Sequence, residues 1–256
     1  MTNPDAANDA VFQYLLRLAD DRLVLGHRLS EWCGHGPILE EDIALANIAL
    51  DLIGQANLLL TLAGDVEGQG RSSDALAYLR DAIDYRNVQL VELPKGDFAF
   101  TIVRQFLFSA FALLQMDALA RSTHADLSGI AAKAAKETKY HVRHSGQWVI
   151  TLGDGTAESH DRAQQALDEL WRYSGELFMA DATDVAAERA GVGVDPSTLE
   201  NSWRVQVNDV LRRATLTVPA DAYMQRGGRT GRHTEHLGHM LTEMQIVARS
   251  HPGAEW

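Results

Sequence analysis

The chain has 256 residues, of which 46% are hydrophobic and 23% charged, a composition typical of a soluble globular protein with a substantial core. Aspartate and glutamate outnumber lysine and arginine by 35 to 23, and the resulting charge of −12 disfavours nucleic acid and anionic lipid as partners. Cys33 is the single cysteine, which excludes an intrachain disulfide and a cysteine-ligated metal cluster, and indicates a reducing compartment.

Glycine and proline clusters divide the sequence into long helix-prone segments, and no run of residues alternates as a strand would. The predicted helices cover roughly Ala6–Trp32, Ile38–Ala63, Asp74–Arg86 after a cap at Ser72 or Ser73, the segment from an Asp97 cap to Arg121, the segment from an Asp126 cap to just before Gly153, Ser159–Leu177, Thr183–Ala190, Pro196–Thr215 and Thr234–Arg249. We therefore expect one all-α domain over residues 1–256, an antiparallel four-helix bundle with additional C-terminal helices.

Two segments indicate where in the cell the protein is found. The N-terminal MTNPDAANDA is polar and acidic, so we expect no signal peptide and a cytoplasmic protein. The most apolar long segment, Phe98–Met116, is interrupted by Arg104 and Gln105, which favours a buried helix over a membrane span.

Polar residues occupy the apolar stripe of the helix that contains KETKYHVRH. Glu137, His141 and His144 fall on the same side as the apolar residues, and a buried carboxylate or imidazole needs a protein partner or a metal. If the two helical hairpins turn near residues 36 and 124, Asp20 and Asp51 lie level with Glu137. These three carboxylates then share one layer of the bundle, as a carboxylate-bridged di-iron site requires.

The rest of a di-iron ligand set is missing from this alignment. Such sites use one Glu on each of two helices and Glu-x-x-His on the other two. The second helix has Gly54 at the histidine position, and the Glu137 helix has Tyr140 there, with His141 one place too late. We therefore favour an internal hydrogen-bond and ion-pair network, with Lys133, Lys136 or Arg104 as cations, over a metal site.

The sequence resembles a known family in several long stretches: LRLADDRLVLGHRLSEWCGH, LANIALDLIGQA, KETKYHVRHSGQW, ELWRYSGELF and HTEHLGHMLTEMQ. It is similar, over almost its whole length, to the PaaC family of structural subunits of the bacterial 1,2-phenylacetyl-CoA epoxidase. The resemblance implies a ferritin-like fold and a partner, the homologous protein PaaA, which carries the di-iron centre and binds phenylacetyl-CoA. PaaB and the reductase PaaE complete the implied complex, and the reductase supplies electrons from NADPH through FAD and an iron–sulfur cluster.

The same resemblance implies no catalytic residue, no metal and no cofactor in this chain. The vestigial metal-site positions would be Asp20, Asp51, Gly54, Glu137, Tyr140 and His141.

Two C-terminal motifs contain side chains that are suited to contacts with a partner protein, a ligand or a metal. RGGRTGR contains Arg226, Arg229 and Arg232 but lacks the Gly-Lys-Ser/Thr ending of a phosphate loop. Arginine suits phosphate or carboxylate, so we favour a contact role for this loop over a mobile surface loop, and a partner protein over coenzyme A. HTEHLGHM places His236 and His239 on one helix face; partner contacts or hydrogen bonds are favoured there over a metal site completed by Glu243.

Three functions remain distinguishable by experiment. The favoured hypothesis is a non-catalytic structural subunit of the epoxidase. The second is a di-metal oxygenase or metal-binding bundle, active on its own, that uses Asp20, Asp51, Glu137 and His141. The third is a free-standing homo-oligomer that stores or binds a ligand.

Overall fold

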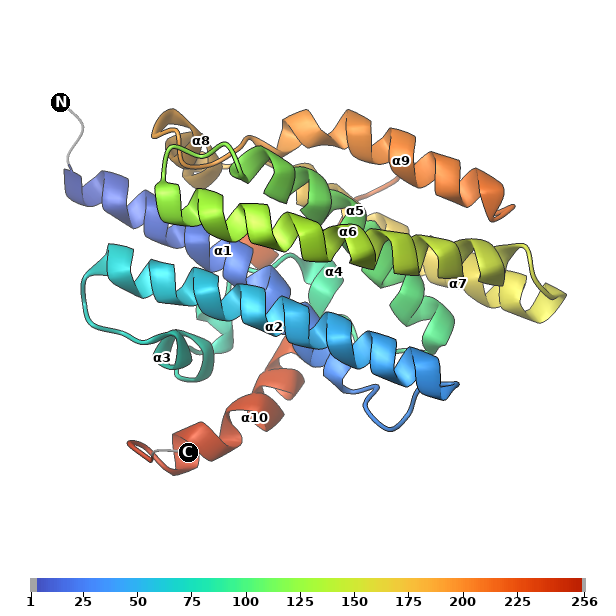
Figure 1. The fold of residues 1–256 in the computed structure, drawn as a ribbon, viewed down its shortest axis with the longest axis horizontal. Coiled ribbons are helices and arrows are strands. Elements are labelled where there is room, and N and C mark those ends of the chain that lie inside the picture. The colour runs from blue at the N-terminus through green and yellow to red at the C-terminus, as the bar shows by residue number, and fades with distance from the viewer. Residues whose placement is uncertain (1–3, 255–256) are drawn as a thin grey trace.

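The computed structural model describes residues 4–254, and within that range it contains helices and no β-strand. Four long helices form the bundle: α1 (Pro4–Ser30), α2 (Leu39–Glu67), α5 (Phe98–Leu119) and α6 (Ala125–Gly153). Helix α1 packs along α2, α5 packs along α6, and α2 contacts α6 (Figure 1). The predicted all-α class is confirmed.

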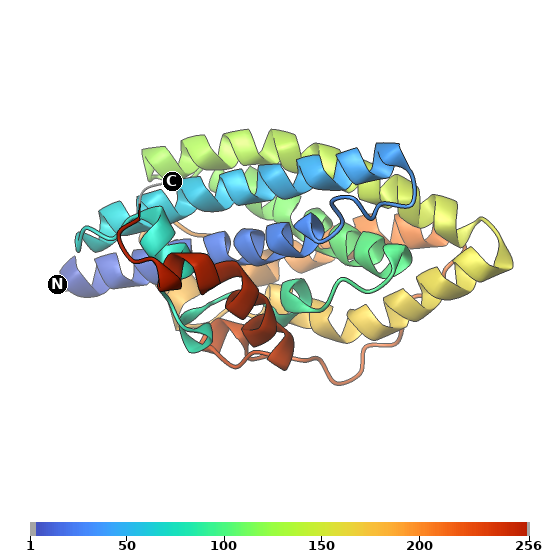
Figure 2. The ribbon, with the colours of Figure 1, turned by 90° about the horizontal axis from the view of Figure 1, so that it is seen from below.

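Shorter helices cover the bundle. They are α3 (Ser73–Tyr78), α4 (Gln89–Glu92), α7 (Ala157–Ser174), α8 (Ala182–Arg189), α9 (Glu200–Arg213) and α10 (Glu235–Ser250). Helices α7 and α9 pack on α5, and α8 packs on α1. Helix α10 crosses the side of the bundle where α3 and its connecting segment lie (Figure 2).

Several predicted helix ends agree with the structure, and others differ. The side chains of Ser72 and Asp97 accept hydrogen bonds from the N–H groups of the first turns that follow them, as N-caps do. The predicted cap at Asp126 is wrong, because α6 begins at Ala125 and the residue before it provides no side-chain cap. The predicted helix over Asp74–Arg86 is also too long: α3 stops at Tyr78, and a short 3₁₀ turn follows.

Helices α2 and α5 are long and apolar enough to cross a membrane by length and composition alone. The most apolar part of α5 is 78% buried inside the fold and that of α2 is 50% buried, as expected of core helices. The prediction that Phe98–Met116 is a buried helix is thus confirmed, whereas α2 keeps a long exposed side.

Helix α1 is unusual because charged side chains occupy its buried surface. Among the residues of α1 whose burial is described, the buried charges are Arg17, Asp20, Asp21, Arg22 and Arg28. An ionised side chain loses several kcal/mol of hydration on burial unless it is paired or hydrogen-bonded, so the partners of these residues organise the interior.

Candidate functional site

Four of the six residues that the sequence assigned to a vestigial metal site lie on the rim between α2 and α6, whereas Asp20 and His141 are fully buried. The Asp51 side chain is 37% exposed and Tyr140 is 39% exposed. Gly54 is exposed, and a Cβ added there would meet no atom within 4 Å. Glu137 is also only partly buried. These four positions therefore cannot share an interior centre, and the sequence-based alignment of α2 and α6 is wrong by one residue.

The residues one position further along each helix face the interior. Leu52 and Gln55 on α2, and Thr138 and His141 on α6, are all at most 3% exposed. Each pair has the i,i+3 spacing of Glu-x-x-His, and an alignment through these residues would place His141 at a histidine position. Leucine and threonine stand at the two carboxylate positions and glutamine at one histidine position. Apolar residues occupy nearly every side of α2, so the sequence did not show that Leu52 faces inward and Asp51 does not.

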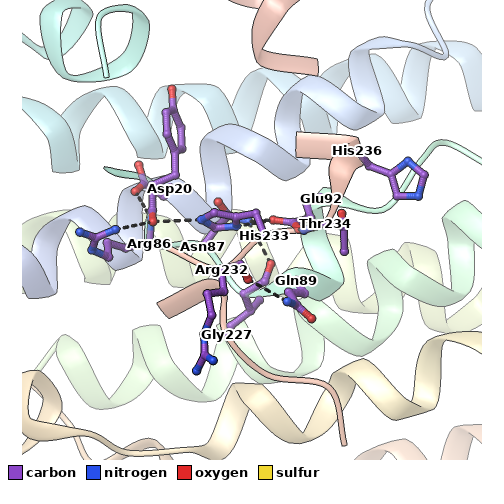
Figure 3. Close-up of polar contacts among 12 residues, drawn as sticks. Asp20, Arg86, Asn87, Gln89, Glu92, Gly227, Arg232, His233, Thr234 and His236 are labelled. Atoms are coloured by element: carbon purple, nitrogen blue, oxygen red, sulfur yellow. Dashed lines mark hydrogen bonds and ion pairs between the residues drawn. The ribbon is translucent and has the colours of Figure 1, made fainter. Parts of the chain in front are cut away.

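Asp20 does not join the α2–α6 layer. Its carboxylate is fully buried and forms a bidentate ion pair with Arg80, which follows α3. It also accepts a hydrogen bond from the Arg86 N–H at 2.8 Å (Figure 3). Asp20 thus holds the α3–α4 connection against α1, which explains why α3 ends early, and its predicted place beside Asp51 and Glu137 is wrong.

A cation from α1 occupies the interior beside the inward residues. Arg22 is fully buried; its Nε donates to Gln55 Oε1 at 3.1 Å and its Nη1 to the Leu18 carbonyl at 2.7 Å. Its Nη2 donates to Gln115 Oε1 on α5, at 3.4 Å. Burial lowers the pKa of Arg22 to about 10, which still leaves the guanidinium charged at neutral pH.

The hydrogen-bond chain continues from Arg22 to the rim. Gln55 Nε2 donates to Glu137 Oε2 at 2.9 Å, and Lys133 Nζ lies 3.8 Å from Glu137 Oε1. The expected internal network therefore exists, with Lys133 at its edge, but its central cation is Arg22, which the sequence pattern did not single out. Arg104 is not part of it, since its guanidinium donates to carbonyls of Leu93 and Pro94.

Two histidine–carboxylate pairs join α2 to α6 along the same seam. His141 Nε2 lies 2.9 Å from Asp51 Oδ2, and His144 Nε2 lies 2.9 Å from Glu41 Oε2. The Tyr140 ring stacks on His144, with 5.8 Å between centroids. These side chains tie the two hairpins of the bundle together.

The side chains that line this layer do not fit a di-iron centre. Of the four inward residues on α2 and α6, only His141 is a good iron ligand, and its Nδ1 has no hydrogen-bond partner. No group of three or more His, Cys, Asp or Glu side chains suited to a metal occurs in residues 4–254. The Arg22 charge adds repulsion: two unit charges 4 Å apart repel by about 4 kcal/mol at an effective dielectric constant of 20.

The C-terminal motifs form a second polar cluster, which fastens the end of the chain to α1 and α4. Arg229 Nη1 and Nη2 donate to the two oxygens of buried Asp21 at 3.0 and 2.8 Å, and Nη1 also donates to the Arg86 carbonyl. The carboxylate of Glu176 accepts from the Gly227 N–H at 2.8 Å. Arg229 is therefore a structural residue, and its expected contact role is wrong; Arg226 and Arg232 are exposed.

His233 and Glu92 form the centre of this cluster (Figure 3). His233 Nδ1 lies 2.7 Å from Glu92 Oε2, and Nε2 lies 3.1 Å from the Tyr85 carbonyl. Burial lowers the pKa of His233, but the Glu92 carboxylate outweighs it, and the net pKa is raised above the ordinary value. Glu92 also accepts from Asn87 Nδ2 and the Thr234 N–H.

The two other histidines of HTEHLGHM are not drawn into this cluster. The His236 side chain points away from it in Figure 3, and His239 is exposed. With Glu243 they form no metal-binding group in the described part of the chain.

Comparison with known proteins agrees with this architecture. A profile of the family described as "Phenylacetic acid catabolic protein" (PaaA_PaaC) matches residues 1–256. The chain belongs to this family. It is also 47% identical over 243 residues to one of the subunits of the 1,2-phenylacetyl-CoA epoxidase of Escherichia coli (strain K12), an alignment that covers 95% of this chain and 98% of the relative.

Proposed function

We propose that the chain is a non-catalytic structural subunit of a 1,2-phenylacetyl-CoA epoxidase. The full-length family match and the relationship to a subunit of the E. coli enzyme support membership of such a complex. The observation that supports a non-catalytic role is the buried Arg22, hydrogen-bonded to Gln55 and Gln115 in the layer where a ferritin-like oxygenase holds its metals.

In this proposal the chemistry takes place elsewhere in the complex. The epoxidation site with its di-iron centre belongs to the homologous catalytic subunit, and a reductase subunit delivers electrons from NADPH. This chain contributes a rigid bundle whose interior is held by hydrogen bonds and ion pairs instead of metal bonds. Its role is to stabilise the catalytic subunit and hold it in a competent arrangement.

Reconstitution tests the proposal. The purified subunits are mixed with phenylacetyl-CoA and NADPH, with this chain or the catalytic subunit left out in turn, and epoxide formation is measured. We expect no turnover when the catalytic subunit is omitted, and reduced turnover when this chain is omitted. Turnover by this chain without the catalytic subunit would refute the proposal.

Metal analysis separates the structural role from a metal-dependent one. Protein expressed in iron-rich medium is expected to contain far less than stoichiometric iron, and Glu137→Ala is expected to leave that content unchanged. Stoichiometric iron that is lost in Glu137→Ala would instead support the autonomous metal bundle.

A further inference from the structure

A row of large aliphatic side chains lies exposed on the outer side of α2. Leu39, Ile43 and Leu50 are 71%, 53% and 67% exposed, and Leu58 continues the row. Their spacing of four, seven and eight residues places them on one helix face. Asp51 is the single charged residue of α2 between Asp42 and Asp65, and it is already bound to His141.

A row of basic side chains lies beside it on α6. The exposed cations are Lys133, Lys136, Lys139 and Arg143. Of these four, only Lys133 has an ion-pair partner among the described residues. The partly exposed Tyr140 lies among them, with the Arg143 guanidinium 5.6 Å from its ring centroid. In a chain of net charge −12, four neighbouring cations with so little compensation stand out as a local charge reversal.

The two rows form one face, which we call the α2–α6 face: Leu39, Ile43, Leu50, Leu58, Lys133, Lys136, Lys139, Tyr140 and Arg143. Helices α2 and α6 lie side by side in both views (Figures 1 and 2). Each helix has 29 residues. Two such helices, about 43 Å long and about 10 Å wide each, present about 900 Å², close to the roughly 800 Å² per partner of a specific protein interface.

We propose that the α2–α6 face is the surface through which this chain docks onto another subunit of its epoxidase, and that the partner presents an apolar surface edged by Asp and Glu side chains. This inference rests on the proposed function, since it requires a complex. The aliphatic row provides the area that becomes buried, and the cations select a partner of complementary charge.

The charges on the face argue against two other occupants. A second copy of the chain would bring the same cations into the interface with few carboxylates to meet them, since Asp51 and Glu137 already have partners. An anionic membrane would attract the basic row but would be repelled by the chain as a whole, whose net charge is −12.

The test uses Leu50→Asp, with Val205→Asp on α9 as a matched control, because Leu50 and Val205 are 67% and 66% exposed in helices on different parts of the molecule. The binding constant for the other purified subunits of the same complex is measured by calorimetry. We expect Leu50→Asp to weaken binding by about 30-fold, the loss typical of a central interface residue, and Val205→Asp to leave it unchanged.

A second pair of variants tests the contribution of the basic row to binding and leaves the aliphatic row unchanged. Lys136→Glu is expected to weaken binding by about tenfold at low salt and less at high salt. The control Arg189→Glu, at an exposed position on α8, should have no effect. Thermal unfolding of every variant checks that the fold is intact.

The outcomes separate this inference from the proposed function. If the unmodified chain binds the other subunits and Leu50→Asp binds equally well, the docking face is refuted and the structural role stands. If the unmodified chain binds none of them, both fail. A dimer of the isolated chain in sedimentation that Leu50→Asp dissociates, or binding to anionic vesicles that Lys136→Glu abolishes, would also overturn the docking proposal.

Discussion

Arg22 Nε donates a hydrogen bond to Gln55 Oε1 at 3.1 Å, so a guanidinium from α1 contacts α2 inside the bundle. In a metal-binding bundle the corresponding interior is negatively charged and is neutralised by iron. Here none of the four inward residues of α2 and α6 is a carboxylate, and the Arg22 guanidinium donates to amide and carbonyl oxygens.

Replacing Arg22 tests how much this interior cation stabilises the fold. We expect Arg22→Ala to lower the free energy of unfolding by about 3 kcal/mol, because it leaves a cavity and unpaired amides of Gln55 and Gln115. Urea unfolding followed by circular dichroism measures the change. The exposed Arg189→Ala is the control and should change the free energy by less than about 0.5 kcal/mol. An equally small change in Arg22→Ala would contradict the assignment.

Rebuilding the ligand set tests the register of the inward residues. The triple variant Leu52→Glu, Gln55→His, Thr138→Glu creates Glu-x-x-His on both helices and keeps His141. With Arg22 retained we expect little cobalt binding; with Arg22→Glu added we expect near-stoichiometric cobalt, because a repelling cation has been replaced by a ligand. Cobalt absorption and metal analysis provide the measurement.

A control set places the same ligand types on the rim, with Asp51→Glu, Gly54→His and Tyr140→His in the Arg22→Glu background. We expect no tight cobalt binding, because these positions are exposed. Tighter binding in the rim set than in the interior set would show that the sequence-based alignment had been correct.

The Asp21–Arg229 pair tests the corrected role of the RGGRTGR loop. Arg229→Ala leaves Asp21 buried and without its cation, so we expect a loss of about 3–5 kcal/mol in the free energy of unfolding. Arg226→Ala, in the same loop but exposed, should cost less than about 0.5 kcal/mol. Comparable stability of the two variants in urea unfolding would argue that the loop is not fastened through Arg229.

The His233–Glu92 pair predicts a dependence of stability on pH. The pKa of His233 is raised in the folded chain, so its contribution is complete below the unfolded pKa of about 6.5 and is lost as pH rises through the folded value. We expect the stability difference between the unmodified chain and His233→Gln to shrink as the pH rises from about 6.5 into the alkaline range. Urea unfolding across this range measures it, with His236→Gln as the control. A difference that grows with pH would have the wrong sign.

Much of the fold followed from local patterns. The long helices of the bundle and the caps at Ser72 and Asp97 depend on residues close together in the chain, so periodicity and capping chemistry predicted them. The early end of α3 was not predictable in this way, because it depends on Arg80 reaching Asp20 on a distant helix. The network among polar residues was predicted in kind, but its central cation was not.

The sequence by itself determined the helical class, the four long helices, the polar residues along their buried stripes and the family resemblance. Only the tertiary structure decided which of those residues face one another. Apolar residues occupy nearly every side of α2, so its sequence leaves the rotation of the helix open, and a change of one residue turns a side chain by about 100°. Packing against α1 and α6 settles that rotation: Gln55 turns inward to Arg22, and Asp51 turns to the rim.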